Sequence, residues 1–418
     1  MGRWKSWVGG LVELAIVLLG LGALGEELKF VDAPGSPIPI KYAWRAVVGD
    51  FNDDGYPDIA VLSPLYYCPD LSCKGVEDTA AVGVLLGRGD GTFEGPTFFP
   101  VGKRSKNPVR IAVGDVNNDG HLDLVVSNPR GLGFVAFPSS IYVLLGDGKG
   151  AFTPAPGSPF TTEHNAGAMV IADFDKDGNP DLAVAHPNAI VLWYGDGTGR
   201  FPWSRKISLL FGTNPKGIVA ADFDRDGYPD LAIASSGREN VLVLLNNFGE
   251  GFRLEVQEYK LPGPAEDLAT GDFNGDGIVD LVAVSRSVEV ADGVFKSHVS
   301  VLLGDGAGGF HGPIHIPIDG RNPRSIAVAD LDRDGNLDLV TANDGSGDLS
   351  VLLGDGMGGF RLASCSPVRI RPCFQCLTWV GAADFNGDGW VDLAVINTLD
   401  DVVVIKLNAL GIAPERRR

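Results

Sequence analysis

A nine-residue pattern of oxygen-bearing side chains recurs seven times along this 418-residue chain, at intervals of 49 to 65 residues. Positions 1, 5 and 9 are Asp in all seven copies, position 3 is Asp or Asn, and position 6 is Gly. Oxygen side chains that alternate along a tight loop converge on one point, which is how proteins hold calcium. The Gly permits the left-handed turn that brings them together, and the varied position 7 suits a ligand that offers only its backbone carbonyl. The pattern therefore predicts up to seven Ca²⁺ sites.

Five residues of each loop, at positions 1, 3, 5, 7 and 9, are the predicted ligands. They are Asp50, Asn52, Asp54, Tyr56 and Asp58; Asp115, Asn117, Asp119, His121 and Asp123; Asp173, Asp175, Asp177, Asn179 and Asp181; Asp222, Asp224, Asp226, Tyr228 and Asp230; Asp272, Asn274, Asp276, Ile278 and Asp280; Asp330, Asp332, Asp334, Asn336 and Asp338; and Asp384, Asn386, Asp388, Trp390 and Asp392. The third, fourth and sixth loops have Asp at position 3, carry one extra negative charge, and should bind the ion more tightly.

Two other interpretations of these loops fit less well. An EF-hand needs a bidentate Glu at its twelfth position, where this chain has residues such as Val61 and Val126 inside the following apolar segment. Asp/Asn/Gly turns without metal are common, but they do not need several carboxylates held within a few ångströms, where they repel one another. We therefore expect calcium loops in which Asp at position 9 supplies the fourth side-chain ligand.

Short strands surround each loop. In the sixth repeat, apolar segments at 325–329, 339–342 and 349–353 are followed by a Gly-rich turn and by Phe360. Four short strands joined by Gly-rich hairpins form one propeller blade, and a period near 50 residues is typical of propellers and solenoids. No window has sustained helical periodicity. The chain is therefore expected to be all-β.

The two ends of the repeated region complement each other. The last repeat stops after Val402–Leu407 and lacks an outer strand, whereas Leu28–Val31 precedes the first loop as an unassigned strand. A closed ring has no exposed edge, so one blade should be shared between the termini. The sequence predicts a seven-bladed β-propeller of four-stranded antiparallel blades, closed by an N-terminal strand that completes the last blade.

The strings GDFNDDGYPDIAV, GDFNGDGIVDLVAV and VLLGDGAGGF resemble the FG-GAP/VCBS repeats of integrin-α-like propellers over roughly residues 27–408. The resemblance implies seven blades, with calcium in the loop between the first and second strands of a blade. Integrin-α propellers carry such loops in only some blades, so seven loops are a departure. The fourth repeat also departs, with Asn246-Asn247-Phe248-Gly249-Glu250-Gly251 at its second turn. Such a resemblance specifies fold better than function.

The N-terminus has the pattern of a secretory signal peptide. Arg3 and Lys5 precede an apolar run, and small residues precede a cleavage point after Gly25. The alternative is an uncleaved membrane anchor, but the run is short and contains Glu13. We expect a signal peptide at 1–25, the propeller at 26–408 and a short tail at 409–418. The protein would be secreted, extracellular or at the cell surface, with the periplasm also compatible, and would have no stable membrane span after cleavage.

Cysteine use agrees with an oxidising compartment. Cys68 and Cys73 lie close enough in sequence to pair. Three others cluster, at Cys365, Cys373 and Cys376, so one of these would be left over and the pairing stays open. A local disulfide is favoured over half a zinc site or a redox motif, because no second CxxC and no βαβ context accompany the cluster.

Charge and composition limit the partners. The net charge of −19 repels phosphate backbones, which excludes nucleic acid as a partner. An extracellular protein or a glycan is the expected ligand, and the sequence gives no oligomeric state. Aromatic and basic residues on long loops opposite the calcium are the candidate ligand contacts, because aromatic anchors on variable loops suit binding. They are Tyr66, Tyr67, Arg130 and Phe134, on the loops Ser63–Ala81 and Ser127–Ser140.

These loops should converge on one rim with Pro34–Trp44 and Ser285–His298. The alternative is that the aromatic residues only pack their own loops. No nucleophile, HExxH or dinucleotide motif accompanies the histidines, so no catalytic residue is assigned.

Three functions remain open. The first is a secreted, calcium-binding, non-catalytic ligand-binding or adhesion module. The second is a carbohydrate-binding lectin of the same fold, which should show shallow aromatic and polar pockets. The third, less favoured, is a polysaccharide-active enzyme of the lyase type, which should show a water-excluding pocket with a perturbed ionisable group.

Overall fold

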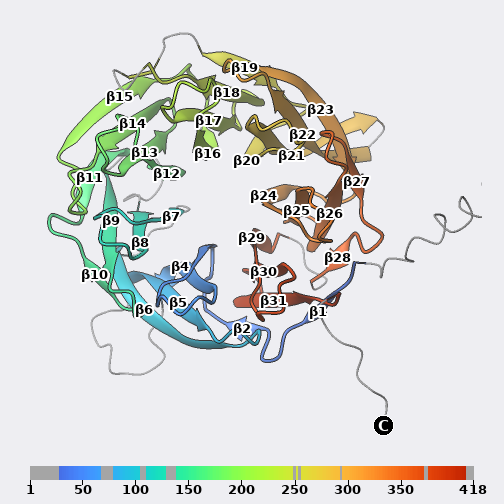
Figure 1. The fold of residues 1–418 in the computed structure, drawn as a ribbon, viewed down its shortest axis with the longest axis horizontal. Coiled ribbons are helices and arrows are strands. Elements are labelled where there is room, and N and C mark those ends of the chain that lie inside the picture. The colour runs from blue at the N-terminus through green and yellow to red at the C-terminus, as the bar shows by residue number, and fades with distance from the viewer. Residues whose placement is uncertain are drawn as a thin grey trace, which may run out of the picture.

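The computed structural model describes residues 28–66, 79–103, 110–128, 138–247, 251–252, 256–291, 294–370 and 375–410. Every regular element in these ranges is a β-strand, and the strands form seven antiparallel sheets. The sheets are arranged as blades around a central axis (Figure 1). The predicted all-β, seven-bladed β-propeller is confirmed. Within the described ranges there is no helix that could span a membrane.

Each blade consists of four consecutive strand positions, numbered from the inside of the ring outward. Blades one to four comprise β3 (Arg45–Gly49), β4 (Asp58–Tyr66), β5 (Thr79–Gly87) and β6 (Phe93–Lys103); β7 (Arg110–Gly114), β8 (Asp123–Asn128), β9 (Pro138–Gly146), β10 (Phe152–Pro154) and β11 (Phe160–His164); β12 (Met169–Ala172), β13 (Asp181–His186), β14 (Ala189–Tyr194) and β15 (Trp203–Ser208); and β16 (Pro215–Ala221), β17 (Asp230–Ser235), β18 (Asn240–Leu244) and β19 (Gln257–Lys260). Blades five to seven comprise β20 (Ala265–Gly271), β21 (Asp280–Ala291), β22 (Val294–Gly304) and β23 (Phe310–Ile318); β24 (Pro323–Ala329), β25 (Asp338–Asn343), β26 (Asp348–Gly354), β27 (Phe360–Leu362) and β28 (Val368–Arg369); and β29 (Leu377–Ala383), β30 (Asp392–Asn397) and β31 (Val402–Asn408), with β1 (Phe30–Asp32) and β2 (Ile38–Pro39) outermost.

The core lies between the blades. Second strands such as β13 and β17 are buried at every residue, because a neighbouring blade covers each face of the sheet. Strands buried on both faces read as continuous apolar runs, and this explains the runs seen in the sequence. The outermost strand β15 is exposed at most positions.

The termini complete one blade together. β1 pairs antiparallel with β31, placing Val31 opposite Leu407, and β2 adds a second contact with Ile38 opposite Val403. The ammonium of Lys406, a largely buried residue, lies 2.8 Å from the carboxylate of Asp32. The predicted pairing of the N-terminal strand with the last blade is confirmed.

One expected loop is instead a hairpin. The segment Ser285–His298 was expected to be a variable loop, but β21 and β22 extend through most of it, with Val288 opposite Lys296. Register shifts interrupt this pairing, so apolar and polar residues do not alternate regularly along it. The extension was therefore hard to recognise from the alternation of residues.

The cysteines are only partly described. Cys376 is buried and disulfide-bonded. Cys68, Cys73 and Cys373 lie outside the described residues, as do the predicted signal peptide and residues 411–418 of the tail. Both the pairing of Cys68 with Cys73 and the signal peptide stay predictions.

Closure of the ring can be tested by truncation. We expect a chain that starts at residue 34, without β1, to melt several degrees below a chain that starts at residue 28, because blade seven loses an edge strand and the Lys406 ammonium loses its carboxylate. Differential scanning calorimetry of both chains in calcium gives the comparison. Equal melting temperatures would show that β1 does not close the ring.

Candidate functional site

The seven carboxylate loops share one backbone conformation. Each joins the first and second strands of a blade. The Gly at position 6 has a left-handed φ in every loop, for example +86° at Gly55 and +90° at Gly335. Position 4 is left-handed as well, in a Gly at loops five and seven and in residues such as Asp53 and Arg333 elsewhere. The turn at position 6 was expected, but the one at position 4 was missed, because most of its residues are not Gly.

The carboxylate at position 9 is buried and connects three parts of its blade. In the first loop, Asp58 is fully buried and accepts hydrogen bonds from the backbone N–H of Phe51 at 2.8 Å and of Gly87 at 2.7 Å. The same two bonds, to position 2 and to the end of the third strand, occur in the other six loops. Position 9 therefore fixes the loop to the sheet whether or not it also touches an ion.

Burial makes these carboxylates hard to ionise. It raises the pKa of Asp58, Asp123 and Asp338 to about 6, and the pKa of Asp181, Asp230 and Asp392 to about 7; the pKa of Asp280 is also raised. Negative charge on other loop carboxylates adds to this effect, whereas the two backbone N–H donors oppose it. A cation in the loop would favour the ionised form.

The carboxylates at positions 1 and 5 hold the turn itself. In the first loop, Asp50 accepts the N–H of Gly55 at 2.8 Å, and Asp54 accepts the N–H of Tyr56 at 2.9 Å. Equivalent bonds recur in every loop. These bonds fold the side chains inward and leave other oxygen lone pairs for an ion.

Three loops bring three carboxylates to one point. In loops three, four and six, positions 1, 3 and 9 each offer an oxygen, and these oxygens lie within 4.8 Å of one another. Two buried oxygens there, Oδ1 of Asp173 and Oδ1 of Asp330, have no hydrogen-bond partner among the described residues. A buried carboxylate oxygen without a donor is costly unless a cation meets it. The donor set, all oxygen and crowded with charge, fits a hard metal ion.

The other four loops have Asn at position 3. In loop one, Asn52 donates to the carboxylate of Asp54 at 2.8 Å, while its amide oxygen accepts the N–H of Asp54. The same donation occurs from Asn117, Asn274 and Asn386. The Asn amide thus replaces one charge by a hydrogen bond within the loop, so these loops tolerate the lack of an ion better.

The loops are also joined around the ring through position 2. In five blades, a Gly in the turn between the third and fourth strands donates its N–H to the position-2 carbonyl of the preceding blade, as Gly150 does to Phe51 at 2.9 Å. In blades four and seven, the described residues make this contact with amide side chains instead, from Asn246 to the carbonyl of Phe174 and from Asn408 to that of Leu331. The departure of the fourth repeat thus preserves the contact by other means.

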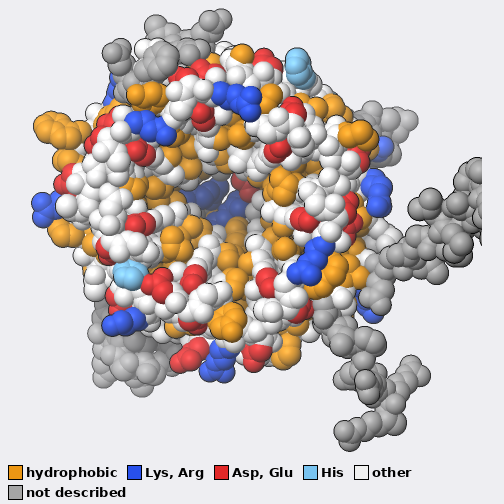
Figure 2. All heavy atoms as spheres, in the orientation of Figure 1, with side chains coloured by type: hydrophobic (Ala, Val, Ile, Leu, Met, Phe, Trp, Pro, Cys, Tyr) orange, Lys and Arg blue, Asp and Glu red, His pale blue; other side chains and the backbone are white. Residues whose placement is uncertain are grey.

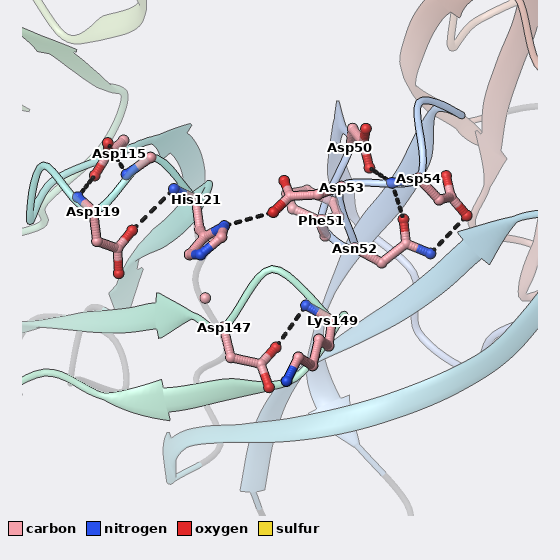
Figure 3. Close-up of polar contacts among 12 residues, drawn as sticks. Asp50, Phe51, Asn52, Asp53, Asp54, Asp115, Asp119, His121, Asp147 and Lys149 are labelled. Carbon is pink, nitrogen blue, oxygen red and sulfur yellow. Dashed lines mark hydrogen bonds and ion pairs between the residues drawn. The ribbon is translucent and has the colours of Figure 1, made fainter.

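Position-4 side chains cross between neighbouring loops. The carboxylate of Asp53 lies 2.6 Å from Nδ1 of His121 in the next loop (Figure 3). Arg225 similarly donates to the carbonyl of Gly277 at 2.9 Å, and Arg333 donates to that of Gly389. His121, predicted from its position 7 to offer a carbonyl, therefore also contacts its neighbour through its ring.

The opposite face carries the second-to-third-strand and blade-to-blade connections. Of its predicted ligand contacts, Tyr66 ends β4, whereas Tyr67, Arg130 and Phe134 lie outside the described residues. Their role as ligand contacts stays a prediction.

Sequence reasoning missed Phe211 on this face. Its side chain is 89% exposed, in the connection between β15 and β16. The connection is fixed by Asn188, whose side-chain oxygen accepts the N–H of Gly212 at 2.9 Å, and by the bond from Asn214 N–H to the carbonyl of Pro187. Beside it lies a cavity of about 230 Å³, lined by Asn214 and His186 among others. A lone Phe in a short linker gives no periodic signal that could have identified it.

Comparison with known families gives a consistent result. The model of the FG-GAP-like repeat matches residues 70–126, 134–184, 173–233, 222–283, 272–341 and 334–395, and the FG-GAP repeat matches residues 42–85. These matches together cover most of the propeller.

Two curated relatives match part of the chain. Phosphatidylinositol-glycan-specific phospholipase D of Rattus norvegicus is 31% identical over 201 residues, which is 42% of this chain and 22% of that protein. Integrin alpha-IIb of Mus musculus is 28% identical over 188 residues, which is 43% of this chain and 17% of that protein. The matches thus span about a fifth of the length of these relatives.

Solved structures support the fold. BBS1N, solved in complex with ARL6DN, aligns with a TM-score of 0.56 at 13% identity, over 93% of this chain and 98% of that one. The rhamnogalacturonan lyase YesW aligns with a TM-score of 0.50 at 15% identity, over 94% of this chain and 76% of that one. At such identities the likeness concerns the fold alone.

Removing a negative charge at position 3 should lower the calcium affinity of a loop, and adding one should raise it. Asp332→Asn should weaken calcium binding at loop six by about tenfold or more, because one carboxylate leaves a cluster of three. Asn274→Asp should strengthen binding at loop five by a similar factor. Isothermal titration calorimetry of calcium into each variant measures both. Asp and Asn both occur at position 3 in other loops of this chain, so neither substitution should disturb the turn. Unchanged calcium affinity in both variants would show that the position-3 side chain does not bind the ion.

The stability of chelated protein should depend on pH. The position-9 carboxylates have a folded-state pKa of about 6 to 7, above the usual range expected in the unfolded chain, so their protonated form favours folding. That contribution is present at pH 4 to 5 and is lost as pH rises through 6 to 7. In EDTA the melting temperature should therefore fall over this window. Added calcium should raise it far more at pH 8 than at pH 5.

Differential scanning calorimetry at the two pH values, with EDTA or with calcium, measures the difference. A calcium effect of equal size at both pH values would show that the loop carboxylates are not coupled to the ion.

Proposed function

Because the chain belongs to the FG-GAP-like repeat family, we propose that it is a secreted, calcium-stabilised propeller that acts as a non-catalytic ligand-binding or adhesion module. The residues predicted at 1–25 would direct export, and 26–408 would form the module. Disulfide-bonded Cys376 is consistent with an oxidising compartment.

Calcium is the ion that we propose for the loops. The donors are carboxylate, amide and carbonyl oxygens, which hard cations prefer. Loops three, four and six would fill first, because they have three converging carboxylates. An exported protein meets calcium near the millimolar range, which would fill even sites with a dissociation constant of about 10⁻⁴ M. The ion would act at a distance from the ligand, by making the ring rigid.

The proposal rests on the difference between the two faces of the ring. On one face, the loops are nearly identical and their polar groups are engaged in holding the turns. On the other face, Phe211 projects from a connection fixed by hydrogen bonds, beside a cavity with both polar and apolar residues in its lining. An exposed aromatic on a preformed surface binds at low entropic cost, so ligand recognition would occur on this face.

The ligand would be an extracellular protein or a glycan. One relative is an integrin, and BBS1N was solved in complex with ARL6DN, which supports a macromolecular partner such as a protein. The polar lining beside Phe211, with His186 and Asn165, leaves a sugar ligand as the second candidate.

The assignment of the binding face is tested with Phe211→Ala. Binding of the wild-type chain to immobilised extracellular-matrix proteins and to a glycan array, in calcium, identifies a ligand for surface plasmon resonance. Phe211→Ala should weaken binding by about tenfold or more, as expected for an aromatic anchor, without changing the melting temperature. Trp203→Ala is the matched control, because Trp203 is also exposed but lies on the outer strand β15. If Trp203→Ala weakens binding as much, or Phe211→Ala not at all, this face is not the binding face.

A further inference from the structure

The channel at the centre of the ring has an uneven charge distribution. Seven residues, each the fifth before the first Asp of its loop, line a cavity of about 190 Å³ there. Blades one and two place Arg45 and Arg110 in this layer, blade five places Asp267, and blades three and four place Ala168 and Gly217. Ser325 and Trp379 complete it. Figure 2 shows the hollow at the centre, with Lys and Arg side chains deep inside it.

Neighbouring charges in the channel neutralise one another only in part. Glu266 pairs with Arg286 at 2.7 Å, and Asp344 pairs with Arg324 at 2.7 Å. Both of these carboxylates are therefore engaged. Lys216, beside Gly217, lines the same cavity as the two arginines. Asp267 is then the one remaining carboxylate in the described channel lining, against three cations.

The three cations have few acceptors among the described residues. Arg45 donates from Nη2 to the carbonyl of Arg324 at 3.3 Å, but its Nε is buried with no hydrogen-bond partner among the described residues. No hydrogen bond or ion pair of the Arg110 guanidinium or the Lys216 ammonium is found within the described ranges. All three residues are half-buried in the channel, so water solvates their charges only in part, and an unpaired cation there is destabilising. An ion supplied from solution would remove that cost.

The electrostatics of Arg110 agree with this geometry. Burial lowers its pKa to about 9, and repulsion from Arg45 adds to the effect, whereas Asp267 and Glu266 oppose it. Burial also lowers the pKa of Lys216. Positive charge is thus in local excess, although the chain as a whole carries −19.

Two cavities border these cations. In the channel lining, a Cβ on Gly217 would lie 2.7 Å from the Leu268 side chain and 3.0 Å from the carboxylate of Asp267, so a larger residue there would displace these groups. Arg110 and Lys216 also line the cavity of about 230 Å³ that contains His186. The channel and this cavity therefore share their cationic wall, and a ligand could enter from the face that carries Phe211.

We propose that Arg45, Arg110 and Lys216 form a binding site for a small oxyanion, a carboxylate or a phosphate group, at the centre of the ring. Guanidinium groups match the planar oxygens of both anions. Asp267 limits the affinity and, by repulsion, disfavours anions of high charge. The site goes beyond the proposed function, because it depends on channel charges and not on the loops or on Phe211.

Three probes on one sugar scaffold test the site and separate the two sources of oxyanion. Glucuronate carries a carboxylate, glucose 6-phosphate carries a phosphate, and glucose is neutral. Isothermal titration calorimetry into the calcium-loaded full chain should show one site for at least one charged probe and none for glucose. The charged probe that binds more tightly shows whether the site prefers a carboxylate or a phosphate. Binding of glucose equal to that of the charged probes, or binding of neither charged probe at 10 mM (a concentration about tenfold above a millimolar dissociation constant), would overturn the proposal.

Substitutions in the channel distinguish a binding site from a structural charge cluster. Arg110→Met keeps the apolar stem and should weaken binding of the charged probe by about tenfold or more. The melting temperature in the absence of probe should be equal or higher, since an unpaired, half-buried cation is removed. A structural arginine would instead lower the melting temperature. Asp267→Asn should act in the opposite direction and tighten binding of the probe.

Arg88→Ala is the control, because Arg88 is an exposed residue whose pair with Glu94 lies at the surface. Unchanged probe affinity in both Arg110→Met and Asp267→Asn would overturn the site. Should Arg110→Met not fold, Asp267→Asn alone decides the question, because it predicts a gain of affinity that misfolding cannot mimic.

Discussion

The buried carboxylate at position 9 of each loop is the interaction on which the propeller depends. It is removed from water and accepts one N–H from its own loop and one from the end of the third strand, as Asp338 does from Leu331 and Gly354. Two charge-assisted bonds to the backbone are strong, yet burial still raises the pKa of this group to about 6. The blade therefore contains an acid that its hydrogen bonds stabilise only in part. A cation in the loop would supply the remaining stabilisation, and metal binding and folding would then be coupled through this residue.

Position 2 extends that coupling from one blade to the whole ring. Its N–H is held by the position-9 carboxylate, its carbonyl accepts from the next blade, and its side chain packs between them. Phe51, for example, is fully buried and lies edge-on to Phe152 of the next blade, at 5.6 Å between ring centres. Displacement of one loop would therefore disturb two blades. Repeat architectures gain stability from such nearest-neighbour contacts, and a closed ring has no end from which fraying could begin.

Much of this could be predicted from the sequence, because the repeat displays it seven times. The number of blades and the positions of the loops follow from the spacing of the repeats, and the closing strand follows from the incomplete last repeat. The Gly at position 6 predicts the left-handed turn of each loop. The substitute contacts of Asn246 and Asn408 could not be predicted, since a side-chain amide there replaces a backbone group that only the folded ring brings near. Phe211 was missed because it lies outside any period. The hairpin extension at β21 and β22 was missed because its register shifts disturb strand alternation.

The channel charges show a different limit of sequence reasoning. Arg45, Arg110 and Asp267 occupy one sequence position relative to their loops, so the repeat does place them in one layer. Their relation across the channel arises only when the ring closes, because blade five then faces blades one and two. The repeated positions are constrained by hydrogen bonds that every blade must make. Among the described residues, the channel side chains share no hydrogen bond that recurs in every blade, so they can differ from blade to blade without loss of the fold. The repeated loop residues thus stabilise the ring, whereas the channel residues vary between blades. The variable residues are therefore the ones that can recognise a ligand.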